Sequence, residues 1–370
     1  MKEIIVRPGR RKGTVSVPRS KSHEHRLLIA DFLAGDLSRM VPCAEDCDDI
    51  IATKRCLSAL SGSESSPVLD CGESGSTRRF IAPIAAALGK NPVYKMAGRL
   101  ADRPHKDYSG IMPGDFILEG NVSSQFVTGL LFALPLLNGD SSIRFSSPLQ
   151  SAGYVEMTLD VLLGASIAFS RTDEGFDSPG SQVYKPQKDV EVERDWSSAA
   201  YWYAMNALGS NVEVSALPAQ SHQPDKAIQN LADDIVSVFP SLRKCIDVSS
   251  CPDLFPALSV VAAASEGETF FKGVRRLRLK ESDRIASMAD VIRRFGAELI
   301  AGDDDVVVRG RGELLNGGTF SSFGDHRIAM AIAVGATVAS GDVQIDDVSC
   351  VAKSYPSFFD MLEKLSILES

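Results

Sequence analysis

A helix-and-strand pattern that recurs about every 60 residues constrains the fold of this 370-residue chain most strongly. Each copy has a small-residue helix that ends near glycine, a β-rich run, a polar loop, an amphipathic helix and a closing strand. Strand runs are expected at 142–145, 211–215, 268–274 and 342–348. The leading helices are expected to begin near Arg26, Arg79, Phe126, Ser198, Phe255 and Arg327. Helices and strands that alternate at this spacing indicate α/β units with crossover connections.

Composition narrows the class of protein. The length predicts two domains, and the net charge of −9 gives no global attraction to nucleic acid or to an anionic membrane. The longest apolar stretch, residues 126–137, is too short to span a bilayer, and the first 22 residues lack the apolar segment of a signal peptide. The seven cysteines are irregularly spaced and fit no standard zinc site, which favours reduced thiols in the cytoplasm.

Polar and charged residues are concentrated just before the repeated helices. In chain order these loops read "SKSHEHR", "GESGSTRR", "GNVSSQF", "ERDWSSA", "CPDLFP" and "FGDHR". The N-terminus of a helix offers unpaired N–H groups and a partial positive charge, which favours bound anions. Any one Ser, Thr or Asp could equally be a helix cap. Several of the loops also carry Lys or Arg where the helix dipole disfavours a cation, so the set predicts an anion-binding centre.

The loops also carry a family resemblance. The segments that carry it are "VPRSKSHEHR", "GESGSTRR", "GNVSSQF", "LKESDRI", "DHRIAMA" and "AKSYPSFF". Their residues and spacings resemble the 5-enolpyruvylshikimate-3-phosphate synthase family from about Pro18 to Phe359. The resemblance implies a two-domain inside-out α/β barrel of six βαβαββ-type units, three per domain. It also implies one domain from residues 20–193, another from 1–19 plus 194–370, and an active site in the cleft between them.

The resemblance implies a reaction that can be compared with the residues. Phosphoenolpyruvate would transfer its enolpyruvyl group to the 5-hydroxyl of shikimate 3-phosphate and release phosphate. Each substrate carries a carboxylate and a phosphate, so the site needs several cations. No metal or organic cofactor is expected, because positioned cations supply the electrostatic stabilisation. The expected partners are these two small molecules, with no nucleic acid and no membrane, and the expected state is a cytoplasmic monomer.

The resemblance also implies individual roles. The residues expected to bind shikimate 3-phosphate are Lys21, Ser22, Arg26, Ser123, Ser124, Gln125, Ser151, Tyr154, Asp253 and Lys280. The residues expected to bind phosphoenolpyruvate are Lys21, Gly75, Arg99, Gln125, Arg284, Arg327 and Lys353. Asp253 is the expected base for the 5-hydroxyl, and Glu281, assisted by Lys21, is the expected proton donor or relay at C3. Asp283 is expected to cap a helix or orient an arginine, and Asp325 to fix Arg327 by an ion pair.

Two departures from the family pattern bear on affinity. Glu73 stands where the family usually has Asn, and this carboxylate should weaken anion binding unless Arg78 or Arg79 neutralises it. Arg78 replaces a residue that is usually apolar. Gly75 matches the glycine that leaves room for glyphosate in sensitive members, so inhibition that competes with phosphoenolpyruvate is expected.

Three other functions are weighed against this one. An enolpyruvyl transferase that acts on a UDP-aminosugar would use a cysteine-containing loop, whereas Cys71 lies one step before Gly72. An RNA-end-processing enzyme or RNA-binding module predicts basic tracts and aromatic platforms, and the chain has a pI near 5.2 and 7% aromatic residues. A non-catalytic anion receptor could use the same cations but would not need Asp253 or Glu281.

Overall fold

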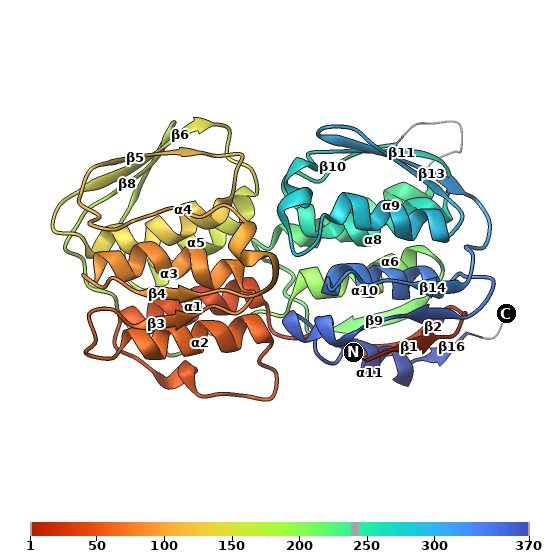
Figure 1. Cartoon of the computed structure of the whole chain (residues 1–370), viewed down its shortest axis with the longest axis horizontal. Coiled ribbons are helices and arrows are strands. Elements are labelled where there is room, and N and C mark those ends of the chain that lie inside the picture. The colour runs from red at the N-terminus through yellow and green to blue at the C-terminus, as the bar shows by residue number, and fades with distance from the viewer. Residues whose placement is uncertain (1, 238–243, 369–370) are drawn as a thin grey trace. The chain divides into compact units, whose positions relative to one another are not determined.

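The computed structural model describes residues 2–237 and 244–368, which form two compact units. Unit 1 comprises Met1–Pro18 and Arg194–Ser370, and unit 2 comprises Arg19–Glu193 (Figure 1). Each unit is described by itself. In the described part of the chain, no helix is long and apolar enough to cross a membrane.

Unit 2 combines central helices with outer sheets. Its helices are α1 (Lys21–Leu33), α2 (Asp48–Leu60), α3 (Gly75–Ala87), α4 (Ser124–Ala133) and α5 (Ala152–Gly164), with short 3-10 turns η1 (Ser38–Met40), η2 (Gly98–Asp102) and η3 (Leu134–Leu136). The parallel pair is β3 (Val68–Asp70) with β4 (Val93–Lys95). The larger sheet has the order β5 (Asp115–Glu119), β6 (Ser141–Ser147), β8 (Gly175–Ser178) and β7 (Ser170–Thr172). Only β5 and β6 run parallel in this sheet.

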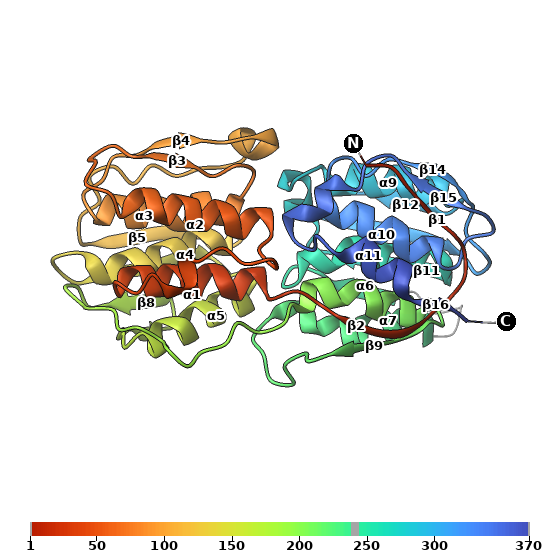
Figure 2. The same ribbon diagram turned by 90° about the horizontal axis from the view of Figure 1, so that it is seen from below.

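Helix α4 lies inside unit 2 because it is apolar around most of its circumference, whereas α2 keeps an exposed face that includes Asp48 and Arg55. In α4 every residue from Phe126 to Ala133 is buried, as expected for a helix enclosed on all sides. The β5–β6–β8 sheet covers one side of this helix layer (Figure 1), and the β3–β4 pair covers another (Figure 2). Helices α3 and α4 approach closely at Gly129, where an added Cβ would lie 2.4 Å from the Arg79 carbonyl oxygen. This close approach places the N-terminal ends of α3 and α4 together.

Unit 1 repeats the arrangement with more helices. They are α6 (Trp196–Ala207), α7 (Ile228–Ser237), α8 (Phe255–Ala264), α9 (Arg284–Arg294), α10 (His326–Ala336) and α11 (Phe358–Lys364), with 3-10 turns η4 (Pro224–Ala227), η5 (Pro252–Leu254), η6 (Arg275–Leu279) and η7 (Ser349–Lys353). One sheet has the order β10 (Lys244–Asp247), β11 (Glu266–Lys272), β13 (Asp305–Arg311) and β12 (Glu298–Ala301). The others are β1 (Ile4–Val6), β15 (Val343–Ile345) and β14 (Gly318–Phe320), and β16 (Ser366–Ile367), β2 (Arg11–Ser16) and β9 (Asn211–Ser215).

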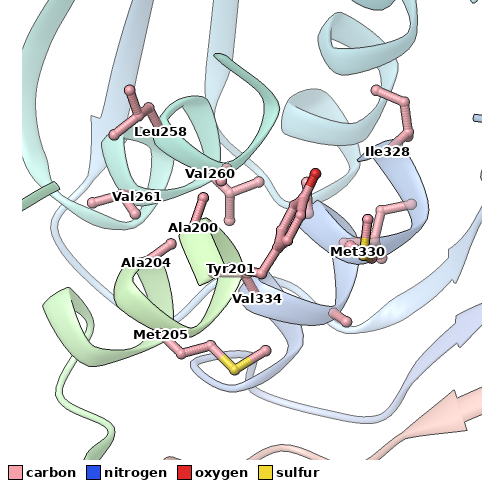
Figure 3. Packing of buried hydrophobic residues seen from close by; sticks show 14 of the residues in the cluster. Ala200, Tyr201, Ala204, Met205, Leu258, Val260, Val261, Ile328, Met330 and Val334 are labelled. Atoms are coloured by element: carbon pink, nitrogen blue, oxygen red, sulfur yellow. The ribbon is translucent and has the colours of Figure 1, made fainter. Parts of the chain in front are cut away.

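Three helices form the centre of unit 1. All eleven residues of α10 are buried, and small side chains let α6 and α8 pack closely against it. Figure 3 shows Ala200 and Tyr201 of α6 beside Val260 of α8 and Val334 of α10. Trp196 and Trp202 are 2% and 0% exposed. This packing holds the first residues of α8 and α10, where the polar loops end, in fixed positions.

Most helices begin at or a few residues before the expected positions. Helix α1 begins at Lys21 rather than near Arg26, because the Ser20 side chain caps it and a polar turn precedes the apolar run. Strand β9 covers the predicted 211–215, whereas β11 begins and ends two residues earlier than 268–274 because Gly273 leaves the strand with a φ of +73°. The expected repeat is shortened in unit 2, where residues 103–114 contain only turns and bends in place of a helix corresponding to α9.

Candidate functional site

Helix caps account for some of the polar residues before the helices. The Ser74 side chain accepts a hydrogen bond from the Thr77 amide at 3.2 Å at the start of α3. The Asp283 carboxylate accepts from the amides of Ile285 and Ala286, both at 3.1 Å, which confirms the predicted cap of α9. The Lys and Arg side chains beside these caps carry no hydrogen-bond acceptor, so capping cannot explain their position at helix starts.

Arg26 lies in a buried setting made of neutral oxygens. Its Nε donates to the Thr158 hydroxyl at 2.9 Å, and its guanidinium also donates to the Tyr154 carbonyl at 2.7 Å. Further donors reach Thr128 at 3.3 Å and the Ser22 carbonyl. Within residues 2–237 and 244–368, no carboxylate forms an ion pair with Arg26. Burial lowers the pKa of Arg26 to about 9, so its charge is held without a counter-ion.

A hydrogen-bonded chain joins the starts of α1, α2 and α3. Lys21 Nζ contacts the Asp49 carboxylate at 2.8 Å. The Thr77 hydroxyl lies 3.4 Å from the Asp49 carbonyl and 2.7 Å from Ser74 Oγ. Lys21, a predicted site residue, is therefore held by a carboxylate that the sequence did not single out. Asp49 was missed because acidic residues in the first turn are common on any helix.

Gln125 connects α4 to α3. Its Oε1 accepts from Arg79 Nη1 at 2.6 Å, and its Nε2 donates to the Ser76 hydroxyl at 2.9 Å. Arg79 also donates to the Pro104 carbonyl at 3.2 Å. The predicted residue Gln125 is therefore fixed by Arg79, which sequence reasoning considered only as a possible partner of Glu73.

Gly75 lies directly against a guanidinium group. A Cβ added at Gly75 would be 3.2 Å from the Cζ and both terminal nitrogens of Arg103. Sequence reasoning named Arg99, which is exposed in η2, and missed Arg103 four residues later. The Glu73 side chain lies against Gly98, where a Cβ would be 2.3 Å from its carboxylate oxygen. The extra carboxylate is therefore next to the loop that carries Arg99.

The remaining candidates of unit 2 lie at the starts of α4 and α5. Ser123 caps α4 by accepting from the Gln125 amide at 3.3 Å, and Ser124 is buried at the first turn. Ser151 precedes α5 with a φ of +57°, a strained conformation for a residue with a side chain. Tyr154 follows in the first turn, and its carbonyl binds Arg26. The contacts of Arg26 thus link the starts of α1 and α5.

Arg284 is the centre of the charged cluster in unit 1. Its guanidinium contacts Asp253 at 2.7 Å, Glu281 at 2.7 Å and Asp325 at 2.8 Å, and its side chain is 1% exposed. Arg284 is the first residue of α9, where the helix dipole disfavours a cation. The three carboxylates outweigh this effect and the cost of burial, and they raise the pKa of Arg284. The structure therefore brings together three predicted site residues, Asp253, Glu281 and Arg284.

Asp253 contacts three cations at once. Besides Arg284, its carboxylate accepts from Arg327 Nη2 at 2.8 Å and from Lys280 Nζ at 3.3 Å. Burial alone would raise the pKa of Asp253, but Arg327, Lys280 and Arg284 outweigh it and hold the pKa well below its usual range. In the structure the predicted base is ionised and engaged by cations that an anionic ligand could also bind.

A further buried carboxylate, that of Asp225, lies near this cluster. Asp225, in η4, accepts a hydrogen bond from the Ser197 hydroxyl and is 1% exposed. Burial raises the pKa of Asp225 to about 6, and the negative charge of Asp253 adds to the rise. Sequence reasoning missed Asp225 because it lies in "SHQPDKA", a segment without a repeated pattern.

The predicted ion pair between Asp325 and Arg327 is not the one observed. The Asp325 carboxylate pairs with Arg284 and accepts from the Ser282 hydroxyl at 3.0 Å, while it caps α10 through the Arg327 amide at 3.0 Å. The Arg327 guanidinium reaches Asp253 instead. The prediction failed because Arg327 is the second residue of α10, so its backbone rather than its side chain faces the capping carboxylate. Lys353 ends η7, which packs against α10, and is buried.

Among the residues that the structure describes, no group of three or more His, Cys, Asp or Glu side chains is arranged to hold a metal ion.

The chain is similar to proteins of known activity. The family model EPSP synthase (3-phosphoshikimate 1-carboxyvinyltransferase) matches residues 109–362. The 3-phosphoshikimate 1-carboxyvinyltransferase of Clostridium kluyveri is 36% identical over 419 aligned residues, covering 99% of this chain and 97% of the relative. The enzyme of the same name from Clostridium perfringens is 34% identical, with coverage of 99% and 98%.

Solved structures share the fold. The EPSP synthase from Acinetobacter baumannii superposes with a TM-score of 0.73 at 21% identity, covering 99% of both chains. The enolpyruvyl transferase NikO from Streptomyces tendae gives a TM-score of 0.67 at 13% identity, covering 99% of this chain and 98% of its own. These similarities confirm the predicted two-domain α/β fold class.

Proposed function

The chain belongs to the EPSP synthase (3-phosphoshikimate 1-carboxyvinyltransferase) family, and we propose that the residues described above perform the reaction of that family. The enzyme transfers the enolpyruvyl group of phosphoenolpyruvate to shikimate 3-phosphate, a step of the shikimate pathway that leads to aromatic amino acids. The substrates are therefore two anions, each with a carboxylate and a phosphate. The assignment of residues to steps is the proposal.

Unit 2 would supply most of the recognition of shikimate 3-phosphate. Arg26, with Ser22 beside it, would bind the carboxylate, because Arg26 is a buried cation that has no carboxylate partner among the described residues. Gln125 and Tyr154 would line the ring. The residues proposed for the 3-phosphate are Ser123, Ser124, Ser151 and Lys280. The strained backbone of Ser151 is consistent with a side chain that is held in place for a ligand.

Phosphoenolpyruvate would be bound by cations of both units. The proposed residues are Lys21, Gly75, Arg99, Gln125, Arg284, Arg327 and Lys353. The contact between Gly75 and the Arg103 guanidinium supports an anion site at this glycine and adds Arg103 to the set. Arginine suits the carboxylate and phosphate because its planar fork can bind two oxygens together.

Asp253 would accept the proton of the 5-hydroxyl as its oxygen attacks C2 of phosphoenolpyruvate. In the structure three cations keep the pKa of Asp253 low, which would make it a weak base. Substrate anions would compete for Lys280, Arg284 and Arg327 and so weaken their hold on the carboxylate. We infer that substrate binding raises the pKa of Asp253 toward the range that proton transfer requires.

Glu281 would donate the proton that C3 gains in the same addition. It contacts Arg284 at 2.7 Å, so Arg284 connects the proposed base and the proposed acid. Lys21, which is held by Asp49, would assist at C3. Elimination then removes a proton from C3 and breaks the bond between C2 and the phosphate oxygen. The net change is one new C–O bond and one released phosphate.

The observation that carries these roles is the contact of Arg284 with Asp253, Glu281 and Asp325. The test of the reaction is phosphate release from phosphoenolpyruvate, measured with shikimate 3-phosphate and with a UDP-aminosugar as alternative acceptors. Release should depend on shikimate 3-phosphate alone. Release that depends on the sugar nucleotide, or a steeply salt-dependent affinity for RNA, would contradict the proposal.

We further propose that the substrates contact residues of both units in a cleft between them. Lys21 and Arg99 belong to unit 2, whereas Lys280 and Arg327 belong to unit 1. Substrate charge would then favour closure of the two units around the ligands. Small-angle X-ray scattering should give a smaller radius of gyration with both ligands than without them, and an equal radius would count against closure.

The enzyme is proposed to act as a cytoplasmic monomer. One chain carries both proposed half-sites, and all seven cysteines are free in the structure, as suits a reducing compartment. Light scattering should give a mass near 39.8 kDa, and cell fractionation should recover the protein with cytoplasmic markers. A concentration-independent dimer mass would contradict the monomer.

A further inference from the structure

Unit 2 contains a cavity that the proposed reaction does not use. It encloses about 430 Å³ between α3, the β4 segment and the loop 105–109. This volume lies in the range of small-molecule sites. None of its lining residues was given a role in binding or converting the two substrates. The cavity lies where residues 103–114 pass over α3 without forming a helix.

The walls of the cavity are partly apolar. Arg78, Ala82 and Ala86 are spaced four residues apart on α3, so they lie along one face of the helix. Pro92 and Tyr94 form another part of the lining. Small and planar side chains leave room for a flat ligand between them.

Arg78 places a cation in this cavity. Its guanidinium carbon lies 3.6 Å from the centroid of the Tyr94 ring, so one face of the planar group is covered by the ring. Its Nε is buried and has no hydrogen-bond partner in the described residues. A buried donor without an acceptor is unfavourable, and a bound anion would relieve this.

Two further polar atoms of the lining also lack partners in the described chain. The Tyr108 hydroxyl is buried, and burial raises the pKa of Tyr108, so the group remains a donor. His105 Nε2 lies 2.8 Å from the Leu100 carbonyl, which can only accept, so Nε2 carries the proton. Burial lowers the pKa of His105, and its buried Nδ1 is therefore an acceptor without a donor.

The charges of the lining favour an anion. Lys106 adds to Arg78, whereas the Lys90 ammonium donates to the carbonyls of Gly62 and Glu64 outside the lining; the carboxylate of the lining is Asp107. One oxygen of Asp107 already accepts from the Ser109 amide at 2.9 Å and hydroxyl at 2.7 Å. Asp107 also interacts electrostatically with Arg78, so a bound carboxylate would share the positive charge of Arg78 with Asp107.

We propose that this cavity binds a small planar carboxylate that carries a hydroxyl group. Because Arg78 Nε, the Tyr108 hydroxyl and His105 Nδ1 are buried in the unliganded structure, these side chains rotate on binding. The carboxylate then contacts Arg78 and the Tyr108 hydroxyl, and the hydroxyl of the ligand donates to His105 Nδ1. The planar body lies between the apolar walls formed by α3 and the β4 segment. A phosphate ion would satisfy Arg78 but would leave these walls unfilled.

The test is calorimetric titration of 4-hydroxybenzoate into the full chain. The wild type should bind one equivalent saturably, and Arg78→Met should weaken binding about tenfold or more. Arg171→Met removes an exposed arginine paired with Glu156 and should leave the affinity within about twofold. Arg26→Met should also leave it within about twofold, since Arg26 belongs to the proposed substrate site.

Absence of saturable binding would overturn the proposal, as would an unchanged affinity in Arg78→Met or a loss confined to Arg26→Met. If phosphate displaces 4-hydroxybenzoate and binds with equal affinity, the claim that the cavity prefers a planar ligand is refuted. If Arg78→Met fails to fold, a second thermodynamic cycle tests the proposal by combining a change of ligand with the substitution of His105. Benzoate should bind several-fold more weakly than 4-hydroxybenzoate to the wild type, and this difference should vanish in His105→Leu. A difference that persists would contradict the assigned hydrogen bond.

Discussion

The two units surround their key arginines with opposite chemistry. In unit 2, Arg26 is buried among hydroxyl and carbonyl oxygens, with no carboxylate partner in the described residues. In unit 1, Arg284 is equally buried but contacts Asp253, Glu281 and Asp325. The first setting leaves a positive charge for a ligand, whereas the second already balances its charge and supplies carboxylates that can transfer protons. The comparison suggests that unit 2 mainly recognises substrate and that unit 1 mainly performs the proton chemistry.

The largest expected effect is on the stability of unit 1. Arg284→Met leaves three carboxylates close together without their shared cation, and removing one partner of a buried ion pair costs about 3–5 kcal/mol. Urea denaturation should show a loss of this size. Arg293→Met, which removes a 68% exposed arginine paired with Asp290, should change the unfolding free energy by less than about 1 kcal/mol. Equal, small losses in both variants would contradict the charge-balanced cluster.

Turnover should depend most strongly on Asp253. Asp253→Asn keeps the size of the side chain but removes the proposed base, and kcat should fall by about 10²–10⁴-fold. The dissociation constant of shikimate 3-phosphate, measured by calorimetry, should change by a much smaller factor. Asp290→Asn alters a carboxylate on the surface of the same unit and serves as the matched control. Normal turnover in Asp253→Asn would show that Asp253 is not the base and would contradict the assignment of proton transfer to unit 1.

Recognition should depend on Arg26. Arg26→Met should raise the KM of shikimate 3-phosphate by about 10–100-fold, because a charged hydrogen bond to a ligand carboxylate is lost. The unfolding free energy should fall by no more than about 3 kcal/mol, because the variant removes a buried charge but leaves the Tyr154 and Ser22 carbonyls without their donor. Steady-state kinetics and urea denaturation of the same samples check both outcomes, with Arg171→Met as control. A large loss of stability without a change in KM would identify Arg26 as a purely structural residue.

A substitution at Gly75, the first residue of α3, should have a smaller effect on substrate binding by unit 2. A side chain at position 75 must displace the Arg103 guanidinium, so Gly75→Ala should raise the KM of phosphoenolpyruvate by about tenfold. The wild type should be inhibited by glyphosate in competition with phosphoenolpyruvate, and Gly75→Ala should weaken that inhibition. Gly341→Ala introduces the same methyl group into open space and should change neither constant. Wild-type rates that are unaffected by millimolar glyphosate would refute the inhibition.

The stability of unit 1 should also depend on pH. Burial raises the pKa of Asp225 to about 6, above its ordinary value of 3.8. The folded protein therefore holds a proton that the unfolded chain releases, and this stability is lost as pH rises from about 4 to 6. At neutral pH, Asp225→Asn should be more stable than the wild type, by on the order of 2 kcal/mol.

Denaturation curves between pH 3 and 7 measure this difference and include the pH range in which Asp247 titrates. Asp247 gives a control of opposite sign, because burial would raise its pKa but hydrogen bonds from Ser249 lower it on balance. The contribution of Asp247 is lost as pH falls, so Asp247→Asn should flatten the curve at its acidic end. A pH-independent difference for Asp225→Asn would show that this carboxyl group titrates normally when folded.

Sequence reasoning reached the fold class, which the comparisons confirm, and it named residues that the structure brings together at helix starts, because both depend on local patterns. Alanine-rich helices that end at glycine indicate the repeat, and loops such as "LKESDRI" place cations at helix starts. The contacts of Asp253 with Lys280 and Arg327 link residues 27 and 74 positions apart, so spacing alone could not specify them. The family resemblance, rather than periodicity, supplied the role of Asp253.

The residues that sequence reasoning missed are defined by tertiary contacts. In the sequence, Asp49 and Asp225 cannot be told from other acidic residues. In the folded chain Asp49 contacts Lys21, and Asp225 is buried. The shortened segment 103–114 could not be recognised from a pattern, because a missing helix leaves no positive signal. The cavity over α3 could not be predicted either, because its lining depends on the tertiary contact between Arg78 and Tyr94.

The most direct test of the division between the units is a crossed kinetic comparison of Arg26→Met and Asp253→Asn. Phosphate release from phosphoenolpyruvate is measured over a range of shikimate 3-phosphate concentrations for both variants and the wild type. Arg26→Met should mainly raise the KM of shikimate 3-phosphate, and Asp253→Asn should mainly lower kcat. Equal effects on kcat in both variants, or a pattern opposite to this one, would contradict the assignment of recognition to unit 2 and proton transfer to unit 1.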